Sequence, residues 1–145
     1  MERKSSNLET NGLMQLISDK VTVNATKETV VHFLKDSSNL VHLLPTEQVS
    51  DFKATKEECS FKVQGGITIS LIQDGEEEGK IFMRSGEKSP FPFRLTLHAV
   101  ALGETTEGYI EFNGEVNVFL KMMVEKPLSA LFNIMSAKLK DHFAA

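Results

Sequence analysis

The most reactive side chains in this 145-residue sequence belong to four histidines and one cysteine. The histidines fit no metal-ligand spacing, because the sequence has no HExxH pattern and no second cysteine. They are His32, His42, His98 and His142. Cys59 falls on the apolar side of an alternating stretch, where a thiol is usually an inert packing residue. We therefore expect no metal, no cofactor and no cysteine nucleophile.

Three polar patterns remain as candidates for chemistry. The glycine pair at 65–66 lacks the spacing and the basic residue of a phosphate-binding loop and is typical of a hairpin turn. The glutamates at 76–78 resemble a solvated hairpin tip, since calcium needs several spaced oxygen ligands. His98 could form a polar cluster with Arg84, Arg94 and Glu111, but strand alternation places Arg94, His98 and Glu111 on a solvated sheet face. No catalytic residue is predicted.

The composition narrows the class of protein. Hydrophobic residues make up 41% and charged residues 25%, which is typical of one soluble globular domain. The net charge is −4 and the 16 basic residues are scattered, so we expect no binding to nucleic acid. We interpret residues 1–11 as a flexible polar segment and residues 12–145 as a single domain. The polar start has no apolar run of the kind a secretory signal needs, which favours a cytoplasmic location.

Alternating side chains and turn signals predict a sheet of seven strands with few helices. The expected strands cover residues 12–24, 49–54, 58–64, 67–73, 80–85, 93–102 and 107–116. One short helix is expected after Thr26 and a second over residues 38–44, ahead of Pro45. A long helix should end the chain. This order predicts an α+β fold with an antiparallel, largely meandering sheet.

One face of the predicted sheet is continuously apolar and must be covered. In the stretch 93–102 the odd positions are apolar, whereas Arg94, Thr96 and His98 point the other way. The terminal helix is the only predicted element long enough to cover that face. Sheet and helix together supply the candidate ligand-binding residues, which are Phe61, Val63, Ile69, Leu71, Met83, Phe93, Leu95, Leu97, Ile110, Phe112, Leu131, Phe132 and Met135.

The terminal apolar segment, residues 117–143, is too often charged to span a membrane. Its longest uncharged run, 127–137, is well short of the roughly 20 residues that a span needs. The helical phase places its first apolar stripe about 180° from the stripe that follows Pro127. We therefore predict a short helix over 117–124 and a main helix over 127–143 with Pro127 in its first turn, so that both stripes face inward. The first stripe adds three candidate ligand-binding residues at the mouth of a cavity: Phe119, Met122 and Met123.

From about Gly12 onward the chain resembles the SRPBCC superfamily, which has the helix-grip fold. That superfamily includes START-type lipid-transfer domains, the birch pollen allergen family and polyketide cyclases. The resemblance is carried by VTVNATKETVVHFLKDSSNLVHLLP near the start and GEVNVFLKMMVEKPLSALFNIMSAKLKDHF near the end. It implies a curved seven-stranded antiparallel sheet gripping a long C-terminal helix, with two short helices between strands one and two. An apolar cavity often lies between sheet and helix in that superfamily.

Three functions remain open from the sequence. The first is binding or carrying a small apolar molecule, such as a lipid, fatty acid or polyketide-like compound, in that cavity. The second is a cyclase- or hydrolase-type enzyme with polar residues in its cavity. Strand alternation would assign these residues to the wrong face if a β-bulge reversed the faces of a strand. The third is a ligand-free interaction module, a homodimer joined through a strand edge or through residues 119–123. A filled core instead of a cavity is also compatible with so many bulky residues.

Overall fold

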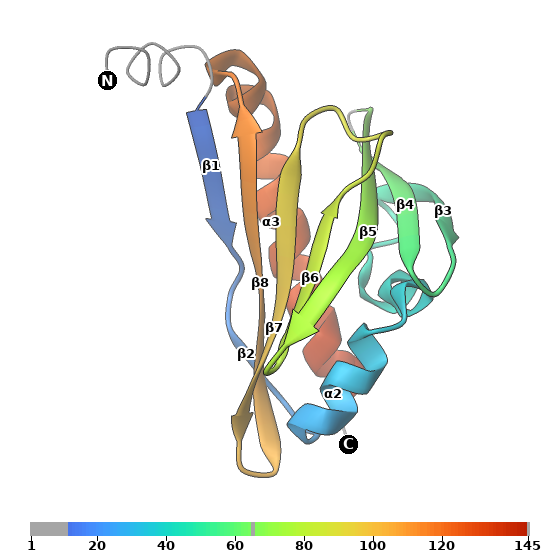
Figure 1. The fold of residues 1–145 in the computed structure, drawn as a ribbon, viewed down its shortest axis with the longest axis vertical. Coiled ribbons are helices and arrows are strands. Elements are labelled where there is room, and N and C mark those ends of the chain that lie inside the picture. Colours follow the sequence, from blue (N-terminus) through green and yellow to red (C-terminus); the bar gives the residue numbers. More distant parts are fainter. Residues whose placement is uncertain (1–11, 65, 145) are drawn as a thin grey trace.

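The structure is a computed structural model that describes residues 12–64 and 66–144. The predicted flexible segment, residues 1–11, lies outside this description. Figure 1 shows a curved sheet wrapped around one long helix. The elements in chain order are β1 (Gly12–Ile17), β2 (Val21–Val23), α2 (Lys27–Leu34), the 3-10 helix η1 (Ser37–Leu43), β3 (Val49–Ala54), β4 (Glu58–Val63), β5 (Ile67–Glu77), β6 (Lys80–Ser85), β7 (Phe93–Leu102), β8 (Thr105–Val116) and α3 (Val118–His142).

The sheet is antiparallel and its strand order is β1-β8-β7-β6-β5-β4-β3, with β2 also paired to β8. The predicted α+β class, the curved sheet and the long C-terminal helix are confirmed. The first predicted strand is divided into β1 and β2. At the break, Ser18 donates its N–H to the carbonyl of Ile110 (2.9 Å), and its hydroxyl accepts from the N–H of Ile110 (2.8 Å). The hydroxyl of Ser18 thus takes the place of a backbone acceptor, so the edge strand stays bonded to β8 where it bends.

Both predicted short helices are present, and a side chain caps the start of each. Thr26 precedes α2 and its hydroxyl accepts from the N–H of Thr29 (3.3 Å), which satisfies one free donor of the first turn. Asp36 plays the same role for η1 by accepting from the N–H of Ser38 (3.0 Å). The second helix has 3-10 rather than α geometry and ends before Pro45, which disfavours helical geometry at the residue preceding it.

The hairpin between β5 and β6 is tighter than the sequence suggested. The predicted turn over 74–79 is reduced to Glu78 and Gly79, because β5 runs on to Glu77, which pairs with Lys80. Both turn residues have positive φ, 38° and 79°, as a two-residue hairpin turn requires. The carbonyl of Gly79 accepts from the N–H of Ala99 (2.7 Å), so the tip of the hairpin is bonded to β7. Only glycine fits here, since an added Cβ would lie 2.3 Å from the carbonyl oxygen of Ala99.

The predicted break at Pro127 is wrong, because α3 is one helix with Pro127 inside it. Asn117 caps its start by accepting from the N–H of Leu120 (2.7 Å). The two apolar stripes do lie on opposite sides, as their phase predicted, but the first stripe is left in solvent instead of being turned inward. Pro127 and Met123 are both exposed, so the carbonyl of Met123, which loses its helical donor, lies on the solvent side of the helix. Over the described residues, no helix is both long and apolar enough to cross a membrane.

Candidate functional site

The predicted ligand-binding residues separate into a buried group and an exposed group. The thirteen candidates from the sheet and the second half of α3 are all buried, with at most 6% of their surface exposed. Phe119, Met122 and Met123 are 73%, 76% and 58% exposed and lie away from that group. The structure therefore brings the thirteen candidates of the inner face together, whereas the three residues predicted at the mouth of a cavity lie apart from them. Whether the buried group encloses a ligand remains a prediction.

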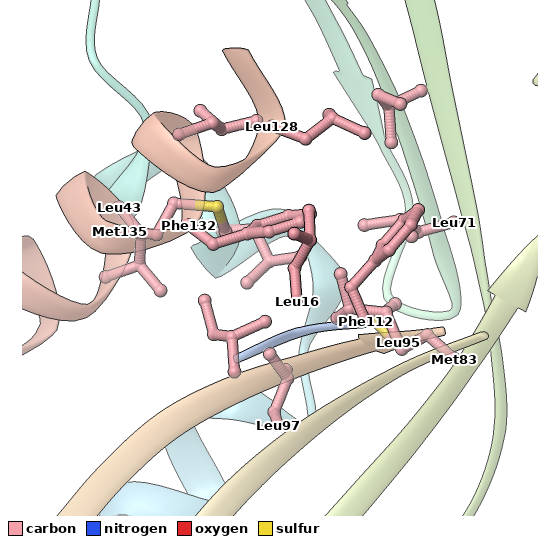
Figure 2. Close-up of a cluster of buried hydrophobic side chains, with 14 of the residues drawn as sticks. Leu16, Leu43, Leu71, Met83, Leu95, Leu97, Phe112, Leu128, Phe132 and Met135 are labelled. Carbon is pink, nitrogen blue, oxygen red and sulfur yellow. The ribbon is translucent and has the colours of Figure 1, made fainter. Parts of the chain in front are cut away.

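The buried group fills the region between α3 and the concave face of the sheet. Helix α3 lies closest to β1, β2, β8 and η1, and reaches the other strands through its side chains. Figure 2 shows Leu128 and Phe132 of α3 reaching toward Leu71 of β5. The far half of the sheet thus contacts the helix through apolar side chains rather than through close backbone packing.

A row of phenylalanine rings connects the sheet to the helix. The ring centroids of Phe93 and Phe112 are 4.9 Å apart, and those of Phe112 and Phe132 are 5.3 Å apart. Phe91 adds an edge-to-face contact with Phe112 at 6.2 Å. Gly114 makes room for this row, because an added Cβ would lie 3.1 Å from the ring of Phe112 and 3.2 Å from that of Phe91. Sequence reasoning missed Gly114, whose only signal was a glycine on the inner face of a strand.

The buried polar side chains beside this region are engaged by the framework. The hydroxyl of Thr106 donates to the carbonyl of Ala25 (2.7 Å), and that of Ser136 donates to the carbonyl of Asn133 (3.0 Å). Among the described residues, no buried side-chain nitrogen or oxygen is without a hydrogen-bond partner. These hydroxyls therefore use their hydrogen bonds to stabilise the fold.

The only thiol is buried at one end of the inner face. Cys59 is 3% exposed, and burial, with a smaller contribution from the negative charge of Glu58, raises the pKa of its thiol to about 12. A thiol with that pKa is protonated near neutral pH, so it packs as a small apolar group and is a poor nucleophile. This agrees with its sequence interpretation as a packing residue.

The outer face of the sheet holds a polar cluster that is less exposed than predicted. Alternation places His98 on this face, but the side chain is buried, so the prediction that it is solvated is wrong. Its ring stacks on that of Tyr109 with centroids 4.3 Å apart, and its Nε2 lies 2.9 Å from Oε1 of Glu111. Hydrogen bonds from His98 and then from Asn113 lower the pKa of the Glu111 carboxyl. Lys20 completes the cluster, with its Nζ 4.8 Å from the centroid of the Tyr109 ring.

Two surface clefts were not predicted from the sequence. The first, of about 440 Å³, lies where β3, β4 and β5 meet the loop after β6, and is lined by Lys53, Ala54, Thr55, Glu58, Cys59, Ser60, Ser70, Ile72, Glu87 and Lys88. The loop after β6 is held by Ser89, whose hydroxyl accepts from the N–H of Ser70 (2.9 Å) and donates to its carbonyl (3.1 Å). The second, of about 430 Å³, is lined by Leu13, Arg84, Ser85, Pro92, Phe93, Arg94, Asn113, Gly114 and Glu115. Of the predicted site residues only Phe93 lines either cleft, beside Gly114 in the second, so the two clefts lie largely outside the predicted site.

Solved structures show which fold this is. A START superfamily protein from Mycobacterium smegmatis has 14% identity and a TM-score of 0.67, with 90% of this chain and 96% of that chain covered. The Zhui aromatase/cyclase from Streptomyces sp. R1128 has 16% identity and a TM-score of 0.66, with 92% and 97% covered. Norcoclaurine synthase from Thalictrum flavum, in complex with dopamine and hydroxybenzaldehyde, has 14% identity and a TM-score of 0.63, with 97% and 94% covered. No family model and no curated protein matches the chain. The chain therefore has the SRPBCC-type helix-grip fold, as its sequence resemblance indicated.

Proposed function

We propose that this chain, with its helix-grip fold, binds a small apolar molecule between α3 and strands β4 to β7. The observation that carries the proposal is the uniformly apolar lining, which both the sheet and the helix supply. Ligand pockets of this kind are mostly apolar, and burial contributes about 25 cal/mol per Å² of apolar surface, less the cost of ordering the ligand. A lipid, a fatty acid or a polyketide-like compound has the matching chemistry.

Entry of such a ligand requires side chains of the inner face to move. Met83 and Met135 lie within this group, and unbranched thioether side chains repack around differently shaped apolar partners. The far half of the sheet is the natural place for this movement, because there the contacts with α3 are made by side chains such as Leu128 and Phe132. Strands β1, β2 and β8 would keep their packing on the helix while the ligand is bound.

The experiment uses the absence of tryptophan from this sequence. A single tryptophan is introduced by Phe132→Trp in the buried group, and by Phe119→Trp on the exposed side of the same helix. The two full-length variants are titrated with a brominated fatty acid, whose bromine quenches tryptophan fluorescence only at short range. We expect saturable quenching of Phe132→Trp and little quenching of Phe119→Trp.

Two results would overturn the proposal. Quenching of neither variant, together with native mass spectra of the unmodified chain that show no bound apolar molecule, would mean a filled core. Quenching of Phe119→Trp alone would place the fatty acid on the surface. Circular dichroism of both variants, compared with the unmodified chain, checks that each is folded.

An enzyme is the second candidate, favoured by the names of two of the solved structures, an aromatase/cyclase and a synthase. An enzyme of that kind needs an acid, base or nucleophile beside its substrate. Among the described residues buried on the inner face, Cys59 is the one with an ionisable side chain, and its pKa of about 12 makes it a poor base and a poor nucleophile near neutral pH. Binding without turnover is therefore the function that the geometry supports best.

A further inference from the structure

The two edges of the sheet differ in how they are protected. Among the described residues, β1 pairs only with β8 and β3 pairs only with β4, so these two strands end the sheet. Strand β3 has Asp51 at φ 56°, an irregular register and a charge at Lys53, all of which hinder pairing with another strand. Strand β1 carries no charge, and its outward side chains Leu13 and Ile17 are 72% and 54% exposed. The β1 edge therefore lacks the usual protection of an edge strand.

The backbone groups that β1 offers along this edge follow from its hydrogen bonds. Ser18 donates its N–H to Ile110 of β8, and the next residue, Asp19, donates its N–H in the opposite direction to Oδ1 of Asn133 on α3 (2.8 Å). Because successive residues of a strand direct their N–H and C=O groups to opposite edges, the groups of Leu13, Gln15 and Ile17 point away from β8. Asn133 thus closes the end of the edge, and within residues 12–64 and 66–144 no hydrogen bond uses the outward backbone groups of these three residues.

Helix α3 adds an apolar side chain beside the same edge. Met122 precedes Asn133 by eleven residues, which brings it to nearly the same side of the helix, about 16 Å toward the helix start. Strand β1 and α3 run in the same direction (Figure 1), so Met122 lies near the level of Met14. Its side chain is 76% exposed. Apolar side chains therefore flank the open edge on both faces of the sheet.

We propose that the β1 edge binds the β1 edge of a second copy of this chain, in an antiparallel pair centred on Gln15. A two-fold axis at Gln15 places Leu13 of one copy opposite Ile17 of the other, so an apolar residue meets an apolar residue on both sides of the axis. The three open residues of each copy would exchange on the order of six backbone hydrogen bonds. The contact uses the same edge in both copies, so it closes at a dimer and does not extend into a fibre.

Sedimentation equilibrium of the full chain over a range of concentrations tests the proposal. We expect a species of twice the 16.2 kDa chain mass at high concentration. Gln15→Lys places like charges opposite each other at the axis and should raise the dissociation constant at least about tenfold. Gln15→Pro removes the central edge N–H, which is bonded to no other described residue, and should have the same effect. Leu102→Lys adds the same charge at an exposed position away from the edge and should leave the dimer unchanged.

A second readout locates the contact directly. The amide of Gln15 should exchange with deuterated solvent more slowly as the protein concentration rises, because dimerisation would bond it. The proposal is overturned if the chain is monomeric at every concentration, or if the dimer survives both substitutions of Gln15. It is also overturned if Phe119→Ser dissociates the dimer while Gln15→Lys does not, because the contact would then be made by α3.

Discussion

The imidazole Nε2 of His98 lies 2.9 Å from the carboxylate Oε1 of Glu111, across the ladder that joins β7 and β8. The same carboxylate accepts from Nδ2 of Asn113 (3.2 Å) and from Nε2 of Gln15 (3.3 Å). With Tyr109 stacked on the imidazole, these residues connect three neighbouring strands on the outer face. This cluster stabilises the sheet at a position where alternation alone predicts a solvated surface.

The stabilisation by Glu111 should depend on pH. Its pKa is lowered in the folded protein, so its contribution is complete above the unfolded value of about 4.5 and is lost as the pH falls through the folded value. We expect Glu111→Gln to lower the free energy of unfolding by about 1 kcal/mol at pH 7, a modest value because the carboxylate is partly solvated. The difference from the unmodified chain should shrink as the pH falls below about 4.5 and through the lowered pKa of Glu111. Urea denaturation between pH 3 and pH 7 measures this, with Glu107→Gln on the same face of β8 as the control.

Gly79 should be far less tolerant of substitution than Gly103. Both have positive φ, 79° and 80°, so alanine at either position is expected to cost about 1 kcal/mol in backbone strain. At Gly79 the new Cβ would also lie 2.3 Å from the carbonyl oxygen of Ala99, whereas nothing lies within 4 Å at Gly103. We expect Gly79→Ala to cost about 2–4 kcal/mol in total, since overpacking adds a further 1–3 kcal/mol. Similar melting temperatures for the two variants would contradict this.

Pro127 should weaken α3 at an exposed position. Pro127→Ala restores an N–H that can donate to the carbonyl of Met123, and we expect a gain in stability of about 1–2 kcal/mol. The gain is below the full cost of a helical proline, because proline also restricts the unfolded chain. The reciprocal change Ala137→Pro, at an exposed position of the same helix, should cost about 3 kcal/mol. Thermal unfolding checks both, and a loss of stability in Pro127→Ala would refute the interpretation.

Gln73 should be important for holding the loops over the inner face. Its Nε2 donates to the carbonyl of Lys35, to the hydroxyl of Ser37 (3.2 Å) and to the carbonyl of Lys56 (3.1 Å). Gln73→Glu replaces this donor with an acceptor that faces two carbonyls, and we expect a loss of about 2–3 kcal/mol. Gln64→Glu, on an exposed turn, should cost less than about 0.5 kcal/mol. Chemical denaturation at neutral pH compares them, and equal losses would contradict a specific role for Gln73.

Alternation in the sequence was enough to predict the architecture and the inner face. Residues 93–102 show why, since every second side chain is apolar and the strand was predicted with its observed bounds. Side-chain contacts between distant residues were not predictable. The burial of His98 depends on its register opposite Tyr109, and the division of the first strand depends on Ser18 meeting Ile110.

The candidate site was predicted only where burial follows from strand or helix phase. The phase of α3 correctly separated Phe119 from Phe132, but the effect of Pro127 was misjudged. A helix with apolar stripes on opposite sides can bend so that both are buried, or it can leave one stripe exposed to solvent. The sequence has no local signal that distinguishes these outcomes, because the choice depends on how much of the helix the sheet can cover.

The bond between Ser89 and Ser70 has a consequence for local opening of the sheet. Strand β6 ends at Ser85. Beyond it the N–H of Gly86 still donates to the carbonyl of Ser70 (2.8 Å), but the N–H of Ser70 is bonded to the hydroxyl of Ser89 and not to a backbone carbonyl. Rotation of one side chain is enough to release this contact, whereas a paired strand has to lose several hydrogen bonds at once. The amide of Ser70 should therefore exchange with solvent through opening of the loop after β6, at a lower free energy than global unfolding. Local opening is thus expected inside one of the longest strands and not only at the ends of the sheet.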